Sequence, residues 1–336
     1  MVAPIIVITI AASTLLSGYS GKKIYDAHKD NKEAKLVNED ANARVEKINK
    51  ELDGVRAVAN DALYELGKLK IKILKNNIDN FIENFSRIKK VDVDDICLPN
   101  DLNKIKFDIQ TIEEFETMSK FAKVYATGLG AGATIGAVTA FGAYSGTMTL
   151  GVAGTGTAIA TLHGAAATNA TLAFLGGGTI AAGGAGITGG VMVLGSVVAV
   201  PALLVFACYT NNKAQKNKED AYTNLEIAKD YVETMNIIKL KCLNVTEIAN
   251  SIYNKIENLL KIFLDFESRF QDIVCYTGTD WREYTAEEKN NIAVCLVLLQ
   301  ALKALLKHSI FDENGEVNEY NKLSQQSNEL IEKYGL

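Results

Sequence analysis

The chain has 336 residues, with 35 Lys and Arg against 40 Asp and Glu and a formal net charge of −5. This balance excludes a protein that binds nucleic acid through a global positive field. The five cysteines form no C-x-x-C pair and the three histidines are far apart in the sequence, so we expect no disulfide framework, no metal site and no cofactor.

The N-terminal segment over residues 4–19 is apolar or small and carries no charge. Extended to Gly21, it reaches the lower limit of about 17 residues for a membrane-spanning helix. Lys22 and Lys23 follow at once, and the positive-inside rule then places the following chain in the cytoplasm. We therefore predict a membrane anchor over residues 1–21, with a cleaved signal sequence and a buried core helix as the alternatives.

A long polar helix is predicted from residue 21 to about residue 90. This stretch contains no proline, and its apolar residues recur at spacings of mostly three and four. Before Leu52 the apolar stripe is thin, which is typical of an exposed helix or a coiled-coil stalk. We expect the helix to end in the loop DVDDICLPND, whose aspartates fit no EF-hand spacing.

Three lysines of this helix share one face: Lys68, Lys72 and Lys75. Such a stripe could contact an anionic ligand such as a phosphate backbone. An ordinary solvated helix face is the simpler interpretation.

The most informative region lies between Lys123 and Lys213, where 89 consecutive residues include no Asp, Glu, Lys or Arg. An ordinary domain is about 25% charged. Lysines flank this uncharged block on both sides, so both ends are predicted to be cytoplasmic and the block to cross the membrane as a hairpin. Residues 188–209 form an apolar segment that is long enough to span the membrane by itself. Residues 145–187 are richer in Gly, Ala and Thr, and would lie buried in an assembly or line a cavity.

Glycines at intervals of four fall on one helix face and allow close helix packing in a bilayer. The predicted packing glycines are Gly128, Gly132, Gly136, Gly142, Gly146, Gly186 and Gly190. Threonine hydroxyls on such helices can line a water-filled path. The candidate lining residues are Thr127, Thr134, Thr139, Thr147 and Thr149.

Three acidic residues stand just before the block: Glu113, Glu114 and Glu116. In a symmetric oligomer they would form acidic rings at a cytoplasmic pore mouth, which favour cations. The alternative is that they form the solvated face of an ordinary helix.

The C-terminal third predicts further helices. Residues 213–275 form one or two amphipathic helices, and Thr285 with Glu288 forms a capping box before a strongly apolar helix. Gln300 and Lys303 interrupt that apolar helix, which favours a buried core helix over a span. A last polar helix is predicted at about residues 317–334.

The fold class is therefore all-α: a membrane protein whose long amphipathic or coiled-coil helices flank a Gly/Ala/Thr-rich transmembrane hairpin. Four parts are predicted: an anchor over residues 1–21, a cytoplasmic stalk over 22–123, the glycine-zipper membrane block over 124–212 and a helical bundle over 213–336.

The run ATNATLAFLGGGTIAAGGAGITGG, residues 167–190, resembles the glycine-rich segment of bacterial glycine-zipper proteins. It is also distantly similar to the membrane-active region of apolipoprotein-L-type pore formers. The size, N-terminal anchor and layout of the chain resemble the membrane effector of the Hailong anti-phage system. That resemblance implies an oligomeric, tetrameric ion channel in the inner membrane, with a nucleotidyltransferase partner whose single-stranded DNA oligomer product keeps the channel shut until phage infection.

The sequence thus predicts an oligomeric channel or pore-forming effector of the bacterial inner membrane that depolarises the host. Its expected partners are the lipid bilayer and further copies of itself, and most of the soluble chain is cytoplasmic. No catalytic constellation stands out, so we do not expect an enzyme. The alternatives are a non-conducting membrane-anchored coiled-coil scaffold and a secreted pore-forming toxin.

Overall fold

The computed structural model describes residues 21–91, 110–129, 138–139, 141–143, 218–311, 317–318 and 320–334. Most of these residues are helical and none of them belongs to a strand, which confirms the all-α prediction. The predicted anchor, apart from Gly21, and most of the uncharged block lie outside the described residues.

The chain divides into two compact units, each made from two stretches of sequence. The first unit comprises residues 1–58 and 195–243, and the second comprises residues 59–194 and 244–336. The two longest described helices are α1 (Gly21–Lys72) and α8 (Lys218–Tyr276). Each helix contributes its first part to the first unit and its second part to the second unit. Each helix therefore meets a different environment in its two parts.

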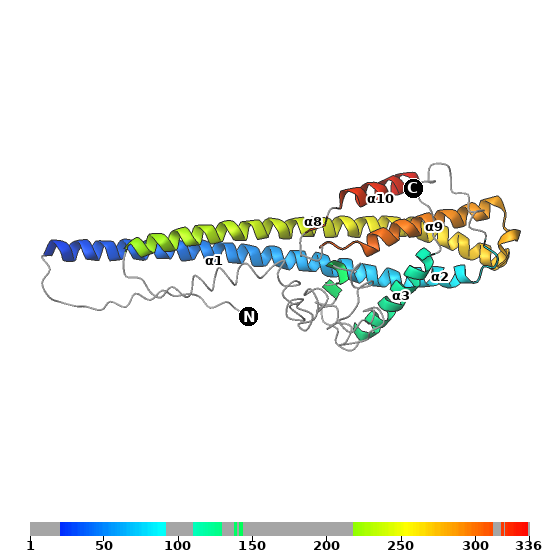
Figure 1. Ribbon diagram of the computed structural model, residues 1–336, viewed down its shortest axis with the longest axis horizontal. Helices are drawn as coiled ribbons and strands as arrows, with labels where there is room; N and C mark the ends of the chain where they lie inside the picture. Colours follow the sequence, from blue (N-terminus) through cyan, green and yellow to red (C-terminus); the bar gives the residue numbers. More distant parts are fainter. Residues whose placement is uncertain are drawn as a thin grey trace. The chain divides into compact units, whose positions relative to one another are not determined.

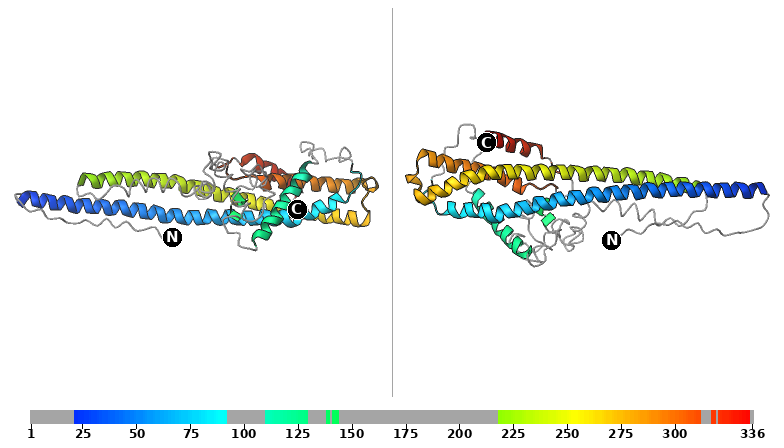
Figure 2. Two further views of the ribbon diagram at one scale, coloured as in Figure 1. Left: turned by 60° about the horizontal axis from the view of Figure 1, so that its bottom comes forward. Right: turned by 180° about the vertical axis from the view of Figure 1, so that it is seen from behind.

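In the first unit, α1 and α8 lie side by side and run in the same direction (Figures 1 and 2). The hydroxyl of Tyr222 donates to the carboxylate of Glu33 over 2.9 Å, and Lys239 forms an ion pair with Glu51 over 2.7 Å. Residue numbers rise together along the two helices at these contacts, so the pair is parallel.

The packing of this pair follows a heptad repeat, as in coiled coils. The buried residues of α8 in the first unit are Ala221, Ala228, Tyr231, Met235, Ile238 and Cys242. Those of α1 are Ala34, Asn38, Ala41, Ile48 and Leu52. Small side chains dominate the first layers, which agrees with the thin apolar stripe and the coiled coil predicted for this part of the chain.

One polar pair lies within this narrow core. The side-chain amide of Asn224 donates to the buried Asn38 side-chain oxygen over 3.0 Å. A buried amide that loses its partner destabilises the fold, so the pair favours the register in which these two residues meet.

In the second unit, α1 continues through a π-helical turn, η1 (Ile73–Ile78), into α2 (Asp79–Ser86). The helix predicted to reach about residue 90 therefore ends slightly earlier. Lys89 exchanges backbone hydrogen bonds with the loop after α8, and Lys90 has a left-handed φ of 58°. The backbone leaves the helical path because it pairs with that loop instead.

The core of the second unit contains α9 (Ala286–Lys307), which begins with the predicted capping box. The backbone N–H of Glu288 donates to the Thr285 hydroxyl over 3.3 Å, and the Thr285 N–H donates to the Glu288 carboxylate over 2.7 Å. Within the described part of the chain, α9 is the one helix apolar and long enough to cross a membrane, yet 67% of its apolar stretch is buried. This burial agrees with the prediction of a core helix.

Aromatic side chains form a further part of this core, beside buried aliphatic residues of α1 and α8. The ring of Phe81 lies 5.6 Å from that of Phe263 and 5.4 Å from that of Phe270, measured between centroids. α10 (Asn321–Tyr334) packs against α9, and α3 (Gln110–Leu129) packs against η1 and α2. Helix α3 is the element that leads into the uncharged block.

Candidate functional site

The described start of the uncharged block lies in the second unit and is fastened there to α1, α2 and α9. We call this region the block junction. Its members are Gly67, Asp79, Thr111, Glu114, Ser119, Lys123, Gly142, Gln300, Lys303 and Lys307.

Glu114 of α3 faces two lysines of α9. Its Oε2 atom lies 2.9 Å from Nζ of Lys303 and 2.8 Å from Nζ of Lys307. Burial alone would raise the pKa of the Glu114 carboxyl, but the hydrogen bonds from Lys307 and Lys303 outweigh it and lower that pKa. The carboxylate is therefore ionised at neutral pH and ties α3 to α9.

Both residues that interrupt the apolar sequence of α9 contact α3. The Lys303 ammonium donates to the hydroxyl of the buried Thr111 over 3.2 Å, and that hydroxyl donates to the side-chain oxygen of Gln300 over 3.0 Å. The polar breaks in α9 are thus explained by the docking of α3.

A second ionic contact joins α3 to α2. The Ser119 hydroxyl donates to one carboxylate oxygen of Asp79 over 2.9 Å, and Nζ of Lys123 lies 2.5 Å from the other. Lys123 is the last charged residue before the block. The chain is therefore held to the helical bundle at the point where the uncharged sequence starts.

Two glycines bring the beginning of the block against α1. A Cβ built on Gly67 would overlap the carbonyl oxygen of Val138 and lie 2.9 Å from the backbone nitrogen of Gly142. A Cβ built on Gly142 would overlap the carbonyl oxygen of Leu63 in the same way. Because backbone atoms, and not flexible side chains, occupy this space, both positions require glycine.

The segment after this crossing is also tied to the end of α9. The backbone N–H of Ile310 donates to the carbonyl of Ala143 over 2.8 Å. Lys70, three residues after Gly67 in α1, is also fully buried. Its Nζ donates to the backbone carbonyl of His308, the C-cap residue of α9, over 3.0 Å. Burial lowers the pKa of Lys70 to about 7. Burial and, to a lesser degree, the neighbouring Lys70 lower the pKa of His308 to about 4.

The three carboxylates of the predicted pore mouth differ in exposure and in ion pairing. Glu114 is paired inside the chain, whereas Glu113 and Glu116 are exposed. Glu116 forms an ion pair with Lys120 of the same helix over 2.6 Å. In this conformation, Glu113 and Glu116 are the members of the predicted mouth that face solvent.

Of the predicted packing glycines, Gly128 lies in α3 and Gly142 lies at the crossing with Gly67. The other five, Gly132, Gly136, Gly146, Gly186 and Gly190, lie outside the described residues. Thr127 lies in α3 and Thr139 is half-buried, whereas Thr134, Thr147 and Thr149 lie outside the described residues. The zipper and the pore lining therefore stay predictions.

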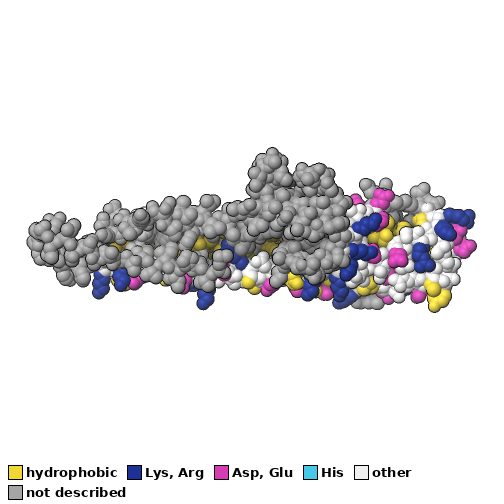
Figure 3. Space-filling model, turned by 90° about the horizontal axis from the view of Figure 1, so that it is seen from below, with side chains coloured by type: hydrophobic (Ala, Val, Ile, Leu, Met, Phe, Trp, Pro, Cys, Tyr) yellow, Lys and Arg dark blue, Asp and Glu magenta, His cyan; other side chains and the backbone are white. Residues whose placement is uncertain are grey.

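The three lysines of the predicted anion stripe, Lys68, Lys72 and Lys75, are all exposed. Lys68 pairs with Glu65 one turn earlier over 3.1 Å, and both side chains are exposed. An exposed lysine paired with a glutamate of its own helix is typical of a solvated helix face, so the anion contact stays a prediction. On the described part of the face in Figure 3, basic and acidic side chains lie interspersed.

The contacts of Gly67, Asp79 and Lys303 at the block junction were not predicted from the sequence. A glycine inside a long helix weakens it by about 1 kcal/mol and can mark the close approach of another backbone. Gly54 of the same helix meets nothing within 4 Å, so the sequence did not distinguish Gly67 from it. The pairings of Asp79 and Lys303 join residues far apart in the chain and leave no local sequence mark.

Comparisons of the chain with protein-family models, with curated proteins and with solved structures found no match. Among the residues that the structure describes, no three His, Cys, Asp or Glu side chains gather as metal ligands would.

Proposed function

We propose that this chain is an oligomeric, channel-forming effector of the bacterial inner membrane. When opened, it depolarises the host cell in defence against phage, and a ligand or partner protein holds it shut at other times. The resemblance described above suggests a nucleotidyltransferase and its single-stranded DNA oligomer product for that inhibitory role. Four copies are the assembly that the same resemblance implies.

The observation that carries the proposal is the parallel pairing of α1 and α8 in the first unit. The contact between Glu33 and Tyr222 sets the first described residue of α8, Lys218, level with about residue 29 of α1. At 1.5 Å per residue, this lies roughly 12 Å from the start of α1 at Gly21. The two helices therefore begin close to the same end of the coiled coil.

Each of these helix starts follows an apolar segment. Residues 4–19 precede α1, and residues 188–209 precede α8. Two apolar segments that join the coiled coil at one end can enter the same bilayer as neighbours. Lys22, Lys23 and Lys218 would then all meet the cytoplasmic surface at that end, as the positive-inside rule requires.

The block junction supports a regulated opening. Two sets of ion pairs fasten the chain just before the block, and one backbone crossing fastens the beginning of the block itself. A ligand that favours or disfavours this docking would shift the position of the membrane block, because a ligand acts by its differential affinity for two states.

The test is to induce the full-length chain in bacteria and to follow carbonate-resistant membrane association and membrane potential together. The matched variant carries Gly132→Leu and Gly136→Leu, which should prevent close helix packing without changing charge. We expect depolarisation by the wild type and none by an equally abundant, membrane-integrated variant.

Purified protein in planar bilayers separates an inhibited channel from the alternatives. A carbonate-resistant protein that neither depolarises cells nor conducts ions after purification would be a scaffold, and the channel proposal would fail. A soluble protein released into the medium would favour the pore-forming toxin.

A further inference from the structure

A second heptad series runs along the exposed side of α8 in the first unit. Its spacing is three and four, as in a coiled-coil seam. We name this series the outer seam; its members are Glu226, Lys229, Glu233, Asn236, Leu240 and Leu243. All six are exposed, whereas the core series on the opposite side of α8 is buried.

The later part of the outer seam is apolar. Leu240 is 65% exposed and Leu243 is 46% exposed, and the adjoining Ile237 is 54% exposed. Solvent-facing positions of a two-helix coiled coil are ordinarily charged or polar. Three large aliphatic side chains within about two turns therefore form an apolar window that neither α1 nor α8 covers.

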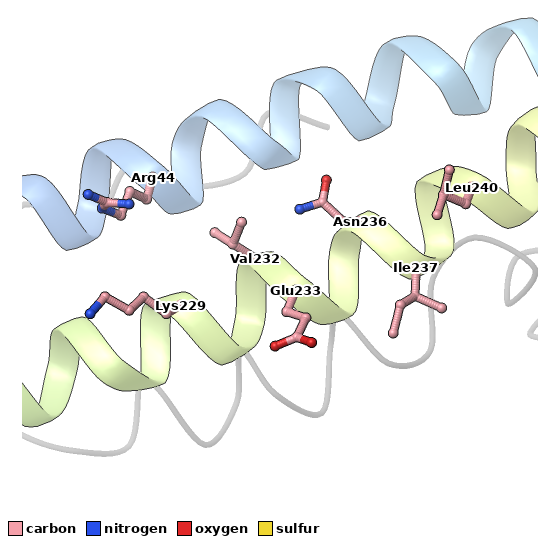
Figure 4. A pocket seen from close by; sticks show the side chains of 7 residues that line it. All are labelled: Arg44, Lys229, Val232, Glu233, Asn236, Ile237 and Leu240. Carbon is pink, nitrogen blue, oxygen red and sulfur yellow. The ribbon is translucent and has the colours of Figure 1, made fainter.

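The window borders a groove of about 350 Å³ lined by seven residues of the first unit, shown in Figure 4. Arg44 comes from α1, and the other lining residues come from α8. Val232 points from α8 toward α1, whereas Ile237 points away from it (Figure 4). The groove thus joins the flank of the coiled coil to the apolar window.

The charges on the seam indicate what covers it. Glu226, Lys229 and Glu233 alternate in sign at spacings of three and four. Lys229 forms an ion pair with Glu226 of its own chain over 2.7 Å, and both side chains are exposed. In two parallel copies placed side by side, Lys229 of one copy lies about one turn along the helix axis from Glu226 and from Glu233 of the other. The charges therefore allow the seam to pair with a second copy of itself, and the parallel direction is the one that brings the apolar windows face to face.

We propose that the outer seam of α8 is the contact through which copies of this chain associate, with Leu240 and Leu243 as its apolar part. This inference rests on the proposed function, because insertion in one membrane orients every copy in the same direction. The window is small beside the 1,200–2,000 Å² typical of a stable soluble complex, as only three large apolar side chains form it. Association through it therefore depends on the high effective concentration that membrane attachment supplies.

The test is cysteine cross-linking of the full-length chain in native membranes. The background carries Cys97→Ser, Cys208→Ser and Cys275→Ser, and retains Cys242 and Cys295, which are buried. Leu240→Cys is compared with Glu46→Cys, an exposed position on the outward side of α1 in the same unit. With a short bismaleimide we expect the covalent dimer yield of Leu240→Cys to exceed that of Glu46→Cys at least fivefold.

Equal dimer yields at the two positions would overturn the proposal. So would a Leu240→Cys thiol that forms no dimer and resists a monofunctional maleimide, because another part of the same chain would then cover the window. As a second variant, Leu240→Glu with Leu243→Glu should lower cross-linking through Asn236→Cys severalfold, and an unchanged yield would also overturn the proposal. Cross-linking is measured only in carbonate-resistant material, so a chain absent from that fraction would contradict the membrane function and not the seam.

Discussion

A single heptad repeat of α8 runs through both units, but the buried side chains at its core positions differ greatly in size between them. In the first unit the repeat places Ala221, Ala228, Met235 and Cys242 in the core; in the second it places Ala249, Ile256, Phe263 and Phe270 there. Burial of apolar area is the main source of stability, at about 25 cal/mol per Å². The second unit is therefore the stable body, and the first is a narrow pair of helices that gains from further packing.

The largest expected effect comes from the aromatic core of the second unit. Phe263→Ala should lower the free energy of unfolding by about 3–5 kcal/mol, because a large cavity would open beside Phe81. Denaturant unfolding of the purified chain in detergent, followed by circular dichroism, measures this loss. The comparison of units would fail if Ala substitution of Met235, at an equivalent repeat position in the first unit, destabilised the protein more.

Two glycines of α1 sharpen the contrast. Gly67→Ala in the second unit should destabilise by about 1–3 kcal/mol, since the new methyl group would meet the backbone of residues 138 and 142. Gly54→Ala in the first unit meets nothing within 4 Å and should stabilise the helix by up to about 1 kcal/mol. Melting temperatures should move in opposite directions, and a shared sign would contradict the crossing at Gly67.

The ion pairs of Glu114 predict a smaller, pH-dependent effect. Glu114→Gln should cost about 1–2 kcal/mol at neutral pH. The pKa of the folded carboxyl is lowered, so its contribution is present above the unfolded value of about 4.3 and is lost as pH falls through the folded value.

Wild-type protein should therefore lose more stability than Glu114→Gln between about pH 6 and about pH 3. Glu116→Gln is the matched control, because that side chain is exposed and pairs within its own helix. Parallel pH profiles for wild type and Glu114→Gln would argue against docking of α3 on α9.

The smallest effect is expected at the corresponding ion pair of the first unit. Glu51→Gln removes the ion pair with Lys239, in which both side chains are partly exposed. Exposed pairs contribute little, so the change in melting temperature should be near the detection limit and below that of Glu114→Gln. A larger loss at Glu51 would reverse the ranking of the two units.

Local patterns predicted much of the fold. Apolar spacing predicted α1, α8 and α9, and the capping box of Thr285 and Glu288 is confirmed. The first helical run was predicted to end at about residue 90, but it ends at Ser86. The cause is the backbone pairing of Lys89 with a loop far away in the chain, which the sequence around Lys89 does not reveal.

The candidate site was less predictable. Glu114 was singled out for its position before the block, but its partners Lys303 and Lys307 lie nearly 200 residues later. One helical surface can hold several carboxylates, and a single sequence does not say which of them faces another helix. Gly142 was assigned to a glycine zipper by spacing, and its described neighbour is Gly67 of α1, a glycine outside the zipper pattern.

The separation of α1 from α8 in the chain has a consequence for synthesis. Residues 73–217 emerge between the two helices, which takes roughly 7–30 s at 5–20 residues per second. During this time α1 is exposed to water without its partner α8, while the uncharged block leaves the ribosome. Ion pairs within α1, such as those of Lys35 with Glu39 and Arg44 with Asp40, suit a helix that has to remain soluble alone until α8 is made.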